Sequence, residues 1–286
     1  MRFLLLFIIA LSIGGCTPNH PEKVVTDDGV TIDYQIHGQG DTTLLFLHGW
    51  SINKSYWANQ VSAFSPAYKV VVIDHAGHGG SSGQHKEWTP QRLGKDVAQT
   101  IEQLSLDHVI IIGHSMSGDI MLETQALVPD NVIGLIGVDN FKEVGQAMTE
   151  EQVSQMKEFL DYFSLHYSEV ADQYVRNGLF VENSPPEAVE RVVKDVLQMD
   201  SVVSVDIIEQ LVWYQPREAD LLRNLRCKLY LLNSSFSPTD TTGLARTCLS
   251  GFQIIDIGPT GHYPMIEDTE RFNHGLREAL HQIARH

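Results

Sequence analysis

The chain has 286 residues, of which 43% are hydrophobic, and this is enough for the packed core of one large domain or two small ones. Its 20 basic and 36 acidic residues give a net charge of −16, which would repel phosphate backbones, so no nucleic-acid partner is expected. The charges are spread along the chain without a long run of one sign. They predict a solubilising surface and say nothing about a substrate.

The first residues predict an export signal. Arg2 precedes an apolar stretch at 3–13 that is too short to span a bilayer as a permanent helix. The motif IGGC that ends at Cys16 resembles the lipobox of bacterial lipoproteins. The resemblance implies that residues 1–15 are removed as a signal peptide and that fatty acyl chains such as palmitate anchor Cys16 in a lipid bilayer. The alternative is an ordinary cleaved signal followed by an incidental cysteine.

The residue after Cys16 bears on the membrane in which the chain would be anchored. It is Thr17, and not the aspartate that holds such lipoproteins at the inner membrane. We therefore expect an exported lipoprotein that is anchored in the outer membrane and faces the periplasm. Residues 16–23 are interpreted as a short tether.

From residue 24 onward, short runs rich in apolar and β-branched residues predict strands. Helical patterns lie between several of these runs, for example after Thr89-Pro90, where a capping residue precedes a proline at the first helical position. Such alternation indicates an α/β fold with a mostly parallel central sheet that is covered by helices on both faces. The predicted strands are at 31–36, 42–47, 69–73, 108–112, 132–138, 228–232 and 252–257.

The interval 141–217 interrupts this alternation. Capping boxes at Thr149-Glu150-Glu151-Gln152 and Ser184-Pro185-Pro186-Glu187 each precede an apolar stripe with helical spacing. Between them, Asn177-Gly178 predicts the end of another helix. We therefore predict a cap of four helices at 141–217, inserted into a core formed by 24–140 and 218–286.

The strand predicted at 108–112 runs into Gly113-His114-Ser115-Met116-Ser117, and a helical pattern follows. By itself this could be a polar turn that ends a buried strand. Its context of strand, turn and helix is that of a nucleophile elbow, G-x-S-x-G, with Ser117 in place of the second glycine. Small residues are needed there because the backbone turns sharply. On these residues the chain resembles the α/β-hydrolase fold family over nearly all of 24–286.

Three further segments match this family. His48-Gly49-Trp50 follows a predicted strand at the family's oxyanion loop, so the backbone N–H groups of Trp50 and Met116 would hold an oxyanion. The stretch 74–81, DHAGHGGS, fits a turn that is structural in the family. Gly258-Pro259-Thr260-Gly261-His262 follows the last predicted strand, where the family carries its general base. The resemblance implies Ser115 as nucleophile and His262 as base.

The acid of the triad is less obvious. Many relatives carry it directly before a proline after the strand at 228–232, but Ser237 stands there and cannot carry a negative charge. Asp139, at the end of 132–138, occupies an acid position that some members use, and Asp240 would need its loop to fold back. We favour Asp139 because a strand end is more rigid than a loop, although its carboxylate could instead cap the first turn of the predicted cap.

Asp256 and Glu267 remain distant candidates for the acid, but we interpret both rather as surface groups. Aromatic residues near the predicted cap are expected to contact substrate. They are Trp50, Phe141, Trp213 and Tyr214.

These residues predict a serine hydrolase that cleaves a small-molecule carboxylic ester through an acyl-enzyme. A serine at the elbow argues against the dehalogenase and epoxide-hydrolase branches, which need an aspartate nucleophile. Carbon–carbon bond cleavage, lactone opening, peracid formation and acyl transfer to another acceptor remain open, because the same scaffold supports them. A non-catalytic binding or receptor protein is a further alternative, motivated by Ser237.

No metal or cofactor is expected. His75, His78 and His85 are not joined by carboxylates or cysteines at ligand spacing, and no phosphate loop or dinucleotide fingerprint is present. Cys227 and Cys248 would be an even pair in an exported protein, so a structural disulfide between them is one possibility. The sequence does not indicate an oligomeric state.

Overall fold

The computed structural model describes residues 21–83 and 85–285. Cys16, the residues 1–15 predicted as a signal peptide and most of the predicted tether lie outside the described residues. Within the part that is described, no helix is both long enough and apolar enough to cross a membrane.

A seven-stranded sheet forms the centre of the molecule, with the strand order β3-β5-β4-β6-β7-β8-β9. β3 pairs antiparallel with β5, and the remaining pairs are parallel. The α/β prediction with a mostly parallel sheet is therefore confirmed. The strands are β3 (Tyr34–His37), β4 (Thr43–Leu47), β5 (Lys69–Ile73), β6 (Val109–His114), β7 (Val132–Val138), β8 (Leu229–Asn233) and β9 (Phe252–Asp256).

The strand expected at 31–36 is divided in two. β2 (Thr31–Ile32) pairs with β1 (Val24–Val25) in a separate two-stranded sheet, whereas β3 joins the main sheet. Asp33 separates them, and its backbone N–H is held by the Ser81 hydroxyl while its carbonyl accepts from Asp74. A single continuous strand is therefore the wrong prediction, because the two halves pair with different partners.

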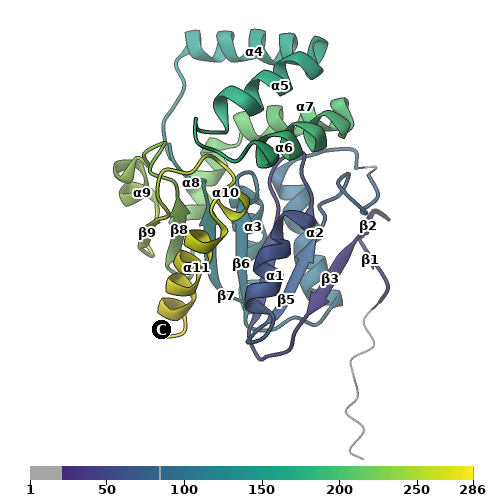
Figure 1. Cartoon of the computed structure of the whole chain (residues 1–286), viewed down its shortest axis with the longest axis vertical. Helices are drawn as coiled ribbons and strands as arrows, with labels where there is room; N and C mark the ends of the chain where they lie inside the picture. The colour runs from purple at the N-terminus through teal and green to yellow at the C-terminus, as the bar shows by residue number, and fades with distance from the viewer. Residues whose placement is uncertain (1–20, 84, 286) are drawn as a thin grey trace, which may run out of the picture.

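Helices cover both faces of the sheet, as Figure 1 shows. The face seen in front carries α1 (Ala58–Phe64) and α11 (Thr269–Ile283), while α2 (Pro90–Gln103), α3 (Ser117–Leu127) and α8 (Gln215–Arg223) lie behind. The central strands are buried on both faces, since every residue of β4 and β6 is buried. Three short helical elements complete the core, namely the 3-10 helix η1 (Lys54–Trp57), α9 (Thr241–Thr247) and α10 (Pro264–Glu267).

A group of helices lies above the carboxyl ends of the strands, as Figure 1 shows. They are α4 (Glu150–Leu165), α5 (Tyr167–Gly178), α6 (Pro186–Gln198) and α7 (Ser201–Val212). We refer to α4–α7 as the cap. α8 begins at Gln215, inside the interval 141–217, but packs on α3 of the core.

The two predicted capping boxes behave differently. Thr149 and Gln152 form a reciprocal capping box at the start of α4. The second prediction is wrong, because α6 is preceded by Pro185 without a side-chain cap and the Ser184 hydroxyl donates to Glu267 instead. Pro186 at the first turn lacks the N–H that such a cap would otherwise help to satisfy.

The disulfide considered between Cys227 and Cys248 is also wrong, because both are free thiols in the structure. The Cys227 sulfur accepts from the Gln125 amide at 3.4 Å, and the Cys248 thiol donates to the Gly251 carbonyl at 3.3 Å. Each sulfur is thus engaged with its own surroundings. Burial raises the pKa of Cys227 to about 11, so this thiol is not activated for exchange.

Candidate active site

Ser115 lies in a sharp turn between β6 and α3. Its φ of 54° is in the left-handed region, which is rare for a residue with a side chain. Its backbone N–H donates to Val138 at 3.0 Å, and its carbonyl accepts from Gly118 at 2.9 Å. A Cβ at Gly113 would lie 2.4 Å from the Ser117 carbonyl oxygen, so only glycine fits there. This strained turn presents the Ser115 side chain at the carboxyl edge of the sheet.

His262, in the loop after β9, lies against Asp139. Its Nδ1 is 2.7 Å from Oδ2 of Asp139, which directly follows β7 and has a φ of 49°. The other carboxylate oxygen, Oδ1, accepts from the backbone N–H of Ser234 at 3.1 Å and pairs with Lys142 Nζ at 2.7 Å. Because a carboxylate can only accept, Nδ1 of His262 is the protonated nitrogen.

The neighbours of the Asp139 carboxyl stabilise its ionised form. Burial alone would raise the pKa of this carboxyl, but the hydrogen bond and charge of His262, together with Lys142, outweigh burial and hold the pKa at about 2. Asp139 is therefore ionised at neutral pH. It can orient the imidazole and stabilise its cationic form.

The other candidate acids lie elsewhere. Asp240 caps α9, with its Oδ1 accepting from Thr242 N–H at 2.8 Å, and it does not contact His262. Asp256 accepts from the Gly258 N–H at 2.8 Å. Ser237, which occupies the position expected for the acid, lines the same small cavity as His262.

Glu267 has a role that the sequence analysis missed. It accepts from the backbone N–H groups on either side of His262, those of Gly261 and Tyr263, both at 2.9 Å. The His262 N–H donates to the Leu179 carbonyl at 2.7 Å. The loop is therefore fixed from the core and from the segment after α5. Glu267 stands five residues after His262, and this spacing is not a sequence pattern from which its role could have been predicted.

His114 also contributes to the position of His262. The His114 ring donates from Nε2 to the His262 carbonyl at 2.8 Å, and the two rings are in tilted contact with their centroids 4.8 Å apart. Burial and the neighbouring His262 lower the pKa of His114 to about 3, so it stays neutral. Among the described residues, no hydrogen bond joins the Ser115 hydroxyl to His262, a contact that often tightens only when substrate binds.

The predicted oxyanion donors lie close to the elbow. A Cβ at Gly49 would lie 2.5 Å from His114 Nδ1 and 3.2 Å from Cβ of Ser115, so the loop that carries Trp50 passes directly beside the nucleophile. Within residues 21–83 and 85–285, neither the Trp50 nor the Met116 backbone N–H finds an acceptor. Unpaired N–H groups are what an oxyanion site requires.

Two neighbouring cavities lie near the catalytic residues, and the elbow lines one of them. One of about 220 Å³ is lined by Ser115, Met116, Asp139 and Phe141, and also by Asp119 and Glu218. The other, of about 250 Å³, is lined almost entirely by apolar side chains, including Trp50 and several cap residues. Leu211 lines both cavities, so the apolar one offers space for a hydrocarbon group next to the cavity that Ser115 lines.

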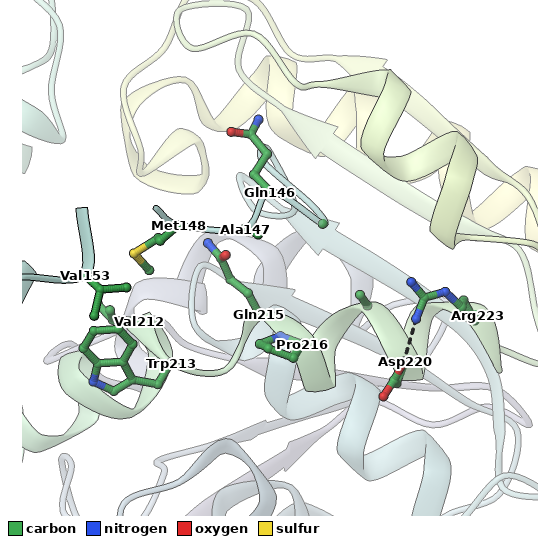
Figure 2. Close-up of a pocket in the computed structure, with 12 residues that line it drawn as sticks. Gln146, Ala147, Met148, Val153, Val212, Trp213, Gln215, Pro216, Asp220 and Arg223 are labelled. Carbon is green, nitrogen blue, oxygen red and sulfur yellow. Dashed lines mark hydrogen bonds and ion pairs between the residues drawn. The ribbon is translucent and has the colours of Figure 1, made fainter. Parts of the chain in front are cut away.

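A larger cavity of about 480 Å³ lies where the cap joins the core, and Figure 2 shows its lining. Trp213 faces this cavity, together with Val153 and Pro216, whereas Ser115 and His262 do not line it. Tyr214 is buried, and its hydroxyl donates to Glu123 at 2.6 Å. Its expected role as a substrate contact is corrected to packing between α3 and α8.

The three histidines considered for a metal have protein partners. His85 is held between two carboxylates, His75 donates to Ser117, and His78 contacts the Ala76 carbonyl. In the described ranges, no three His, Cys, Asp or Glu side chains are arranged to hold a metal ion.

Comparisons with known proteins indicate the fold and the class of enzyme. A family profile described as the alpha/beta hydrolase fold matches residues 42–182. The chain is 23% identical to 3-oxoadipate enol-lactonase 2 of Acinetobacter baylyi over 91% of this chain and 97% of that protein. It is 35% identical to a putative esterase/lipase of Haemophilus influenzae, over 38% of this chain and 39% of that protein.

Solved structures show the same fold. A thermophilic esterase from Thermogutta terrifontis superposes with a TM-score of 0.77 at 23% identity, covering 91% of this chain and 98% of that one.

Proposed function

Since the chain has the α/β-hydrolase fold and is a hydrolase, we propose that it cleaves carboxylic esters through an acyl-enzyme on Ser115. The observation that carries this proposal is the 2.7 Å contact between His262 Nδ1 and Asp139 Oδ2, at the same sheet edge as the strained turn at Ser115. That contact gives His262 the carboxylate that Ser237 cannot provide.

In the proposed reaction, His262 Nε2 takes the proton of the Ser115 hydroxyl while the oxygen attacks the ester carbonyl. The N–H groups of Trp50 and Met116 would donate to the oxyanion of the tetrahedral intermediate. As the intermediate collapses, the imidazolium gives its proton to the departing alcohol. Water, deprotonated by His262, then attacks the acyl-enzyme and releases the carboxylic acid. Asp139 stays ionised throughout and stabilises the imidazolium.

The cavities support esters with an apolar group. The apolar cavity lined by Trp50 lies next to the cavity lined by Ser115, and Leu211 lines both. A cavity of about 250 Å³ could enclose a short hydrocarbon chain. We infer that the acyl or alcohol part of the substrate lies between the cap and Trp50.

Opening of a lactone is the second candidate, since the likeness to an enol-lactonase extends over 97% of that protein. A lactone differs from an open ester in that the leaving alcohol stays attached to the acyl group. Comparing kcat/KM for a simple lactone and an open ester of similar size would distinguish the two activities.

A fluorophosphonate probe tests the proposal. It should label the parent protein at Ser115, and Ser115→Ala should abolish both labelling and hydrolysis of 4-nitrophenyl butyrate. A folded parent that the probe does not label would favour the non-catalytic binding protein instead. An alcohol-dependent product ratio would indicate acyl transfer.

For the location we propose a lipid anchor on Cys16, supported by the IGGC motif and the preceding apolar stretch. The full-length chain expressed in a Gram-negative host should incorporate an alkyne analogue of palmitate and sediment with outer membranes. Cys16→Ser should lose the label and be released in soluble form. Labelling that survives this substitution would contradict the anchor.

A further inference from the structure

The hydroxyl of Ser117 is fully buried and makes two hydrogen bonds. It lies 2.5 Å from the His48 carbonyl and 2.8 Å from Nε2 of His75. A carbonyl can only accept, so the hydroxyl donates its proton to His48 and accepts from His75. Ser117 stands where the elbow motif has a glycine, which could make neither bond.

The two histidines are themselves joined. The His75 backbone N–H donates to Nε2 of His48 at 3.0 Å, and Nδ1 of His48 donates to the Gly49 carbonyl at 2.8 Å. Both rings are buried, and burial lowers the pKa of each below its ordinary value. Each ring is therefore neutral and is held in a single tautomer. We call His48, His75 and Ser117 the buried triangle.

The buried triangle connects three segments that come together only in the fold. His48 follows β4, His75 follows β5 after Asp74, and Ser117 begins α3. Ser117 is the residue after Met116, and His48 lies two residues before Trp50. The Ser117 hydroxyl therefore links the stretch of backbone that carries Met116 to the one that carries Trp50. The N–H groups of these two residues have no acceptor in the described part of the chain.

From this we propose that Ser117 is a positioning residue which, through His48 and His75, sets the separation of the two oxyanion donors. This inference rests on the proposed function. Without the hydroxyl, the His48 carbonyl and the His75 Nε2–H would be buried without partners, and the oxyanion loop would have to shift to regain them. A small shift weakens hydrogen bonds that form only in the transition state.

Ser117→Ala should lower kcat for 4-nitrophenyl butyrate by about ten- to a hundredfold, less than loss of a whole oxyanion donor, with little change in KM. A boronic acid, which forms a tetrahedral adduct with the serine, should bind more weakly by a similar factor. Loss of stability alone would not change kcat measured well below the melting temperature.

Variants of His75 separate positioning from packing. His75→Gln keeps an N–H donor at a similar reach and should retain most of the activity, whereas His75→Leu keeps the bulk without the donor and should behave like Ser117→Ala. Thr124→Val is the matched control, because Thr124 is another buried hydroxyl of α3, bonded to the Ile120 carbonyl at 2.8 Å. It should lower the melting temperature and leave kcat unchanged.

Two results would overturn the inference. One is folded Ser117→Ala with the kcat and boronic acid affinity of the parent. The other is equal activity in His75→Gln and His75→Leu. In either case a parent that still reacts with fluorophosphonate leaves the proposed function intact, whereas a parent that fails to react removes both proposals.

Discussion

Two histidines of this molecule contact carboxylates at almost the same distance. His262 Nδ1 lies 2.7 Å from Asp139, and His85 lies 2.7 Å from Asp28 on one side and 2.6 Å from Asp96 on the other. The side chain of His262 is 18% exposed and lines a cavity, whereas that of His85 is 0% exposed.

The difference shows when such a contact predicts catalysis. His85 uses both ring nitrogens, so no nitrogen is left to take a proton from a substrate or nucleophile. Burial alone would lower its pKa, but the hydrogen bonds and charges of Asp96 and Asp28 outweigh burial and raise it, which favours a permanent cation. His262 has a single carboxylate partner, and the nucleophile lies nearby in the elbow. A histidine bonded to one carboxylate, with its other nitrogen free, is the arrangement suited to a base.

The largest effect should follow from Asp139→Asn, which we expect to lower kcat by about 10³- to 10⁴-fold. Asparagine has the shape of aspartate but cannot stabilise the imidazolium, and it can select the wrong tautomer of His262. Steady-state hydrolysis of 4-nitrophenyl butyrate measures the change. Asp240→Asn is the control and should stay within about twofold of the parent, because this side chain only caps α9. The reverse pattern would transfer the acid role to Asp240.

Asp96→Asn, at the other histidine, should destabilise the fold by about 3 kcal/mol, because it removes the buried carboxylate that His85 and Arg92 share and leaves each cation with a single, more exposed carboxylate partner. The kcat should not change. A histidine whose pKa is raised on folding stabilises the protein fully below its unfolded value of 6.5, and this contribution is lost as the pH rises through the folded value. Urea unfolding on either side of neutrality should show the loss in the parent and a smaller one in Asp96→Asn.

A fall in kcat for Asp96→Asn at unchanged stability would contradict the assignment of a purely structural role to His85. An unchanged urea midpoint would show that the buried charges find other partners.

A third site has buried carboxyls without a histidine. Asp119 and Glu218 line the same cavity as Ser115, and burial raises the pKa of Glu218 to about 7 against the weaker, opposing effect of Asp119. A carboxyl with a raised pKa binds more protons in the folded state, so stability falls as the pH rises from 4.5 to about 7.

Glu218→Gln should remove this loss and make the protein more stable than the parent by about 1 to 3 kcal/mol at alkaline pH, with no gain at acid pH. Urea unfolding at two pH values measures the difference. Asp220→Asn, an exposed carboxylate of the same helix, is the control and should show no such pH dependence. Equal stability of Glu218→Gln and the parent at alkaline pH would mean that the pair ionises without cost.

The sequence predicts best what depends on neighbouring residues. The strands are visible as β-branched runs, and the turn at Ser115 follows from small residues between a strand and a helix. The choice between Asp139 and Asp240 depends on a contact across 123 positions, so only the greater rigidity of a strand end favoured Asp139. Glu267 and the buried triangle could not be predicted, because their partners meet only through the strand order. Ser117 looked like a tolerable replacement of glycine, while in the structure both of its hydrogen bonds are used.

The smallest change in activity and stability is expected for Lys142, whose ammonium group pairs with the Asp139 carboxylate. Asp139 has a lowered pKa, so its contribution to stability is present above 3.8 and is lost as the pH falls toward 2. Lys142→Met removes one cause of this lowering and should reduce the acid-induced loss by about 1 kcal/mol, measured by urea unfolding at mildly and strongly acidic pH. The kcat should fall by less than about tenfold, because His262 and the Ser234 N–H still hold the carboxylate.

Lys142→Arg keeps the positive charge. It is the control for Lys142→Met and should behave like the parent. A loss of kcat in Lys142→Met as large as that in Asp139→Asn would mean that the lysine, and not the carboxylate alone, orients His262. The small effect on kcat expected here follows from the geometry, because Lys142 pairs with Oδ1 while His262 is bonded to Oδ2. Removing the cation leaves the oxygen that contacts the base in place.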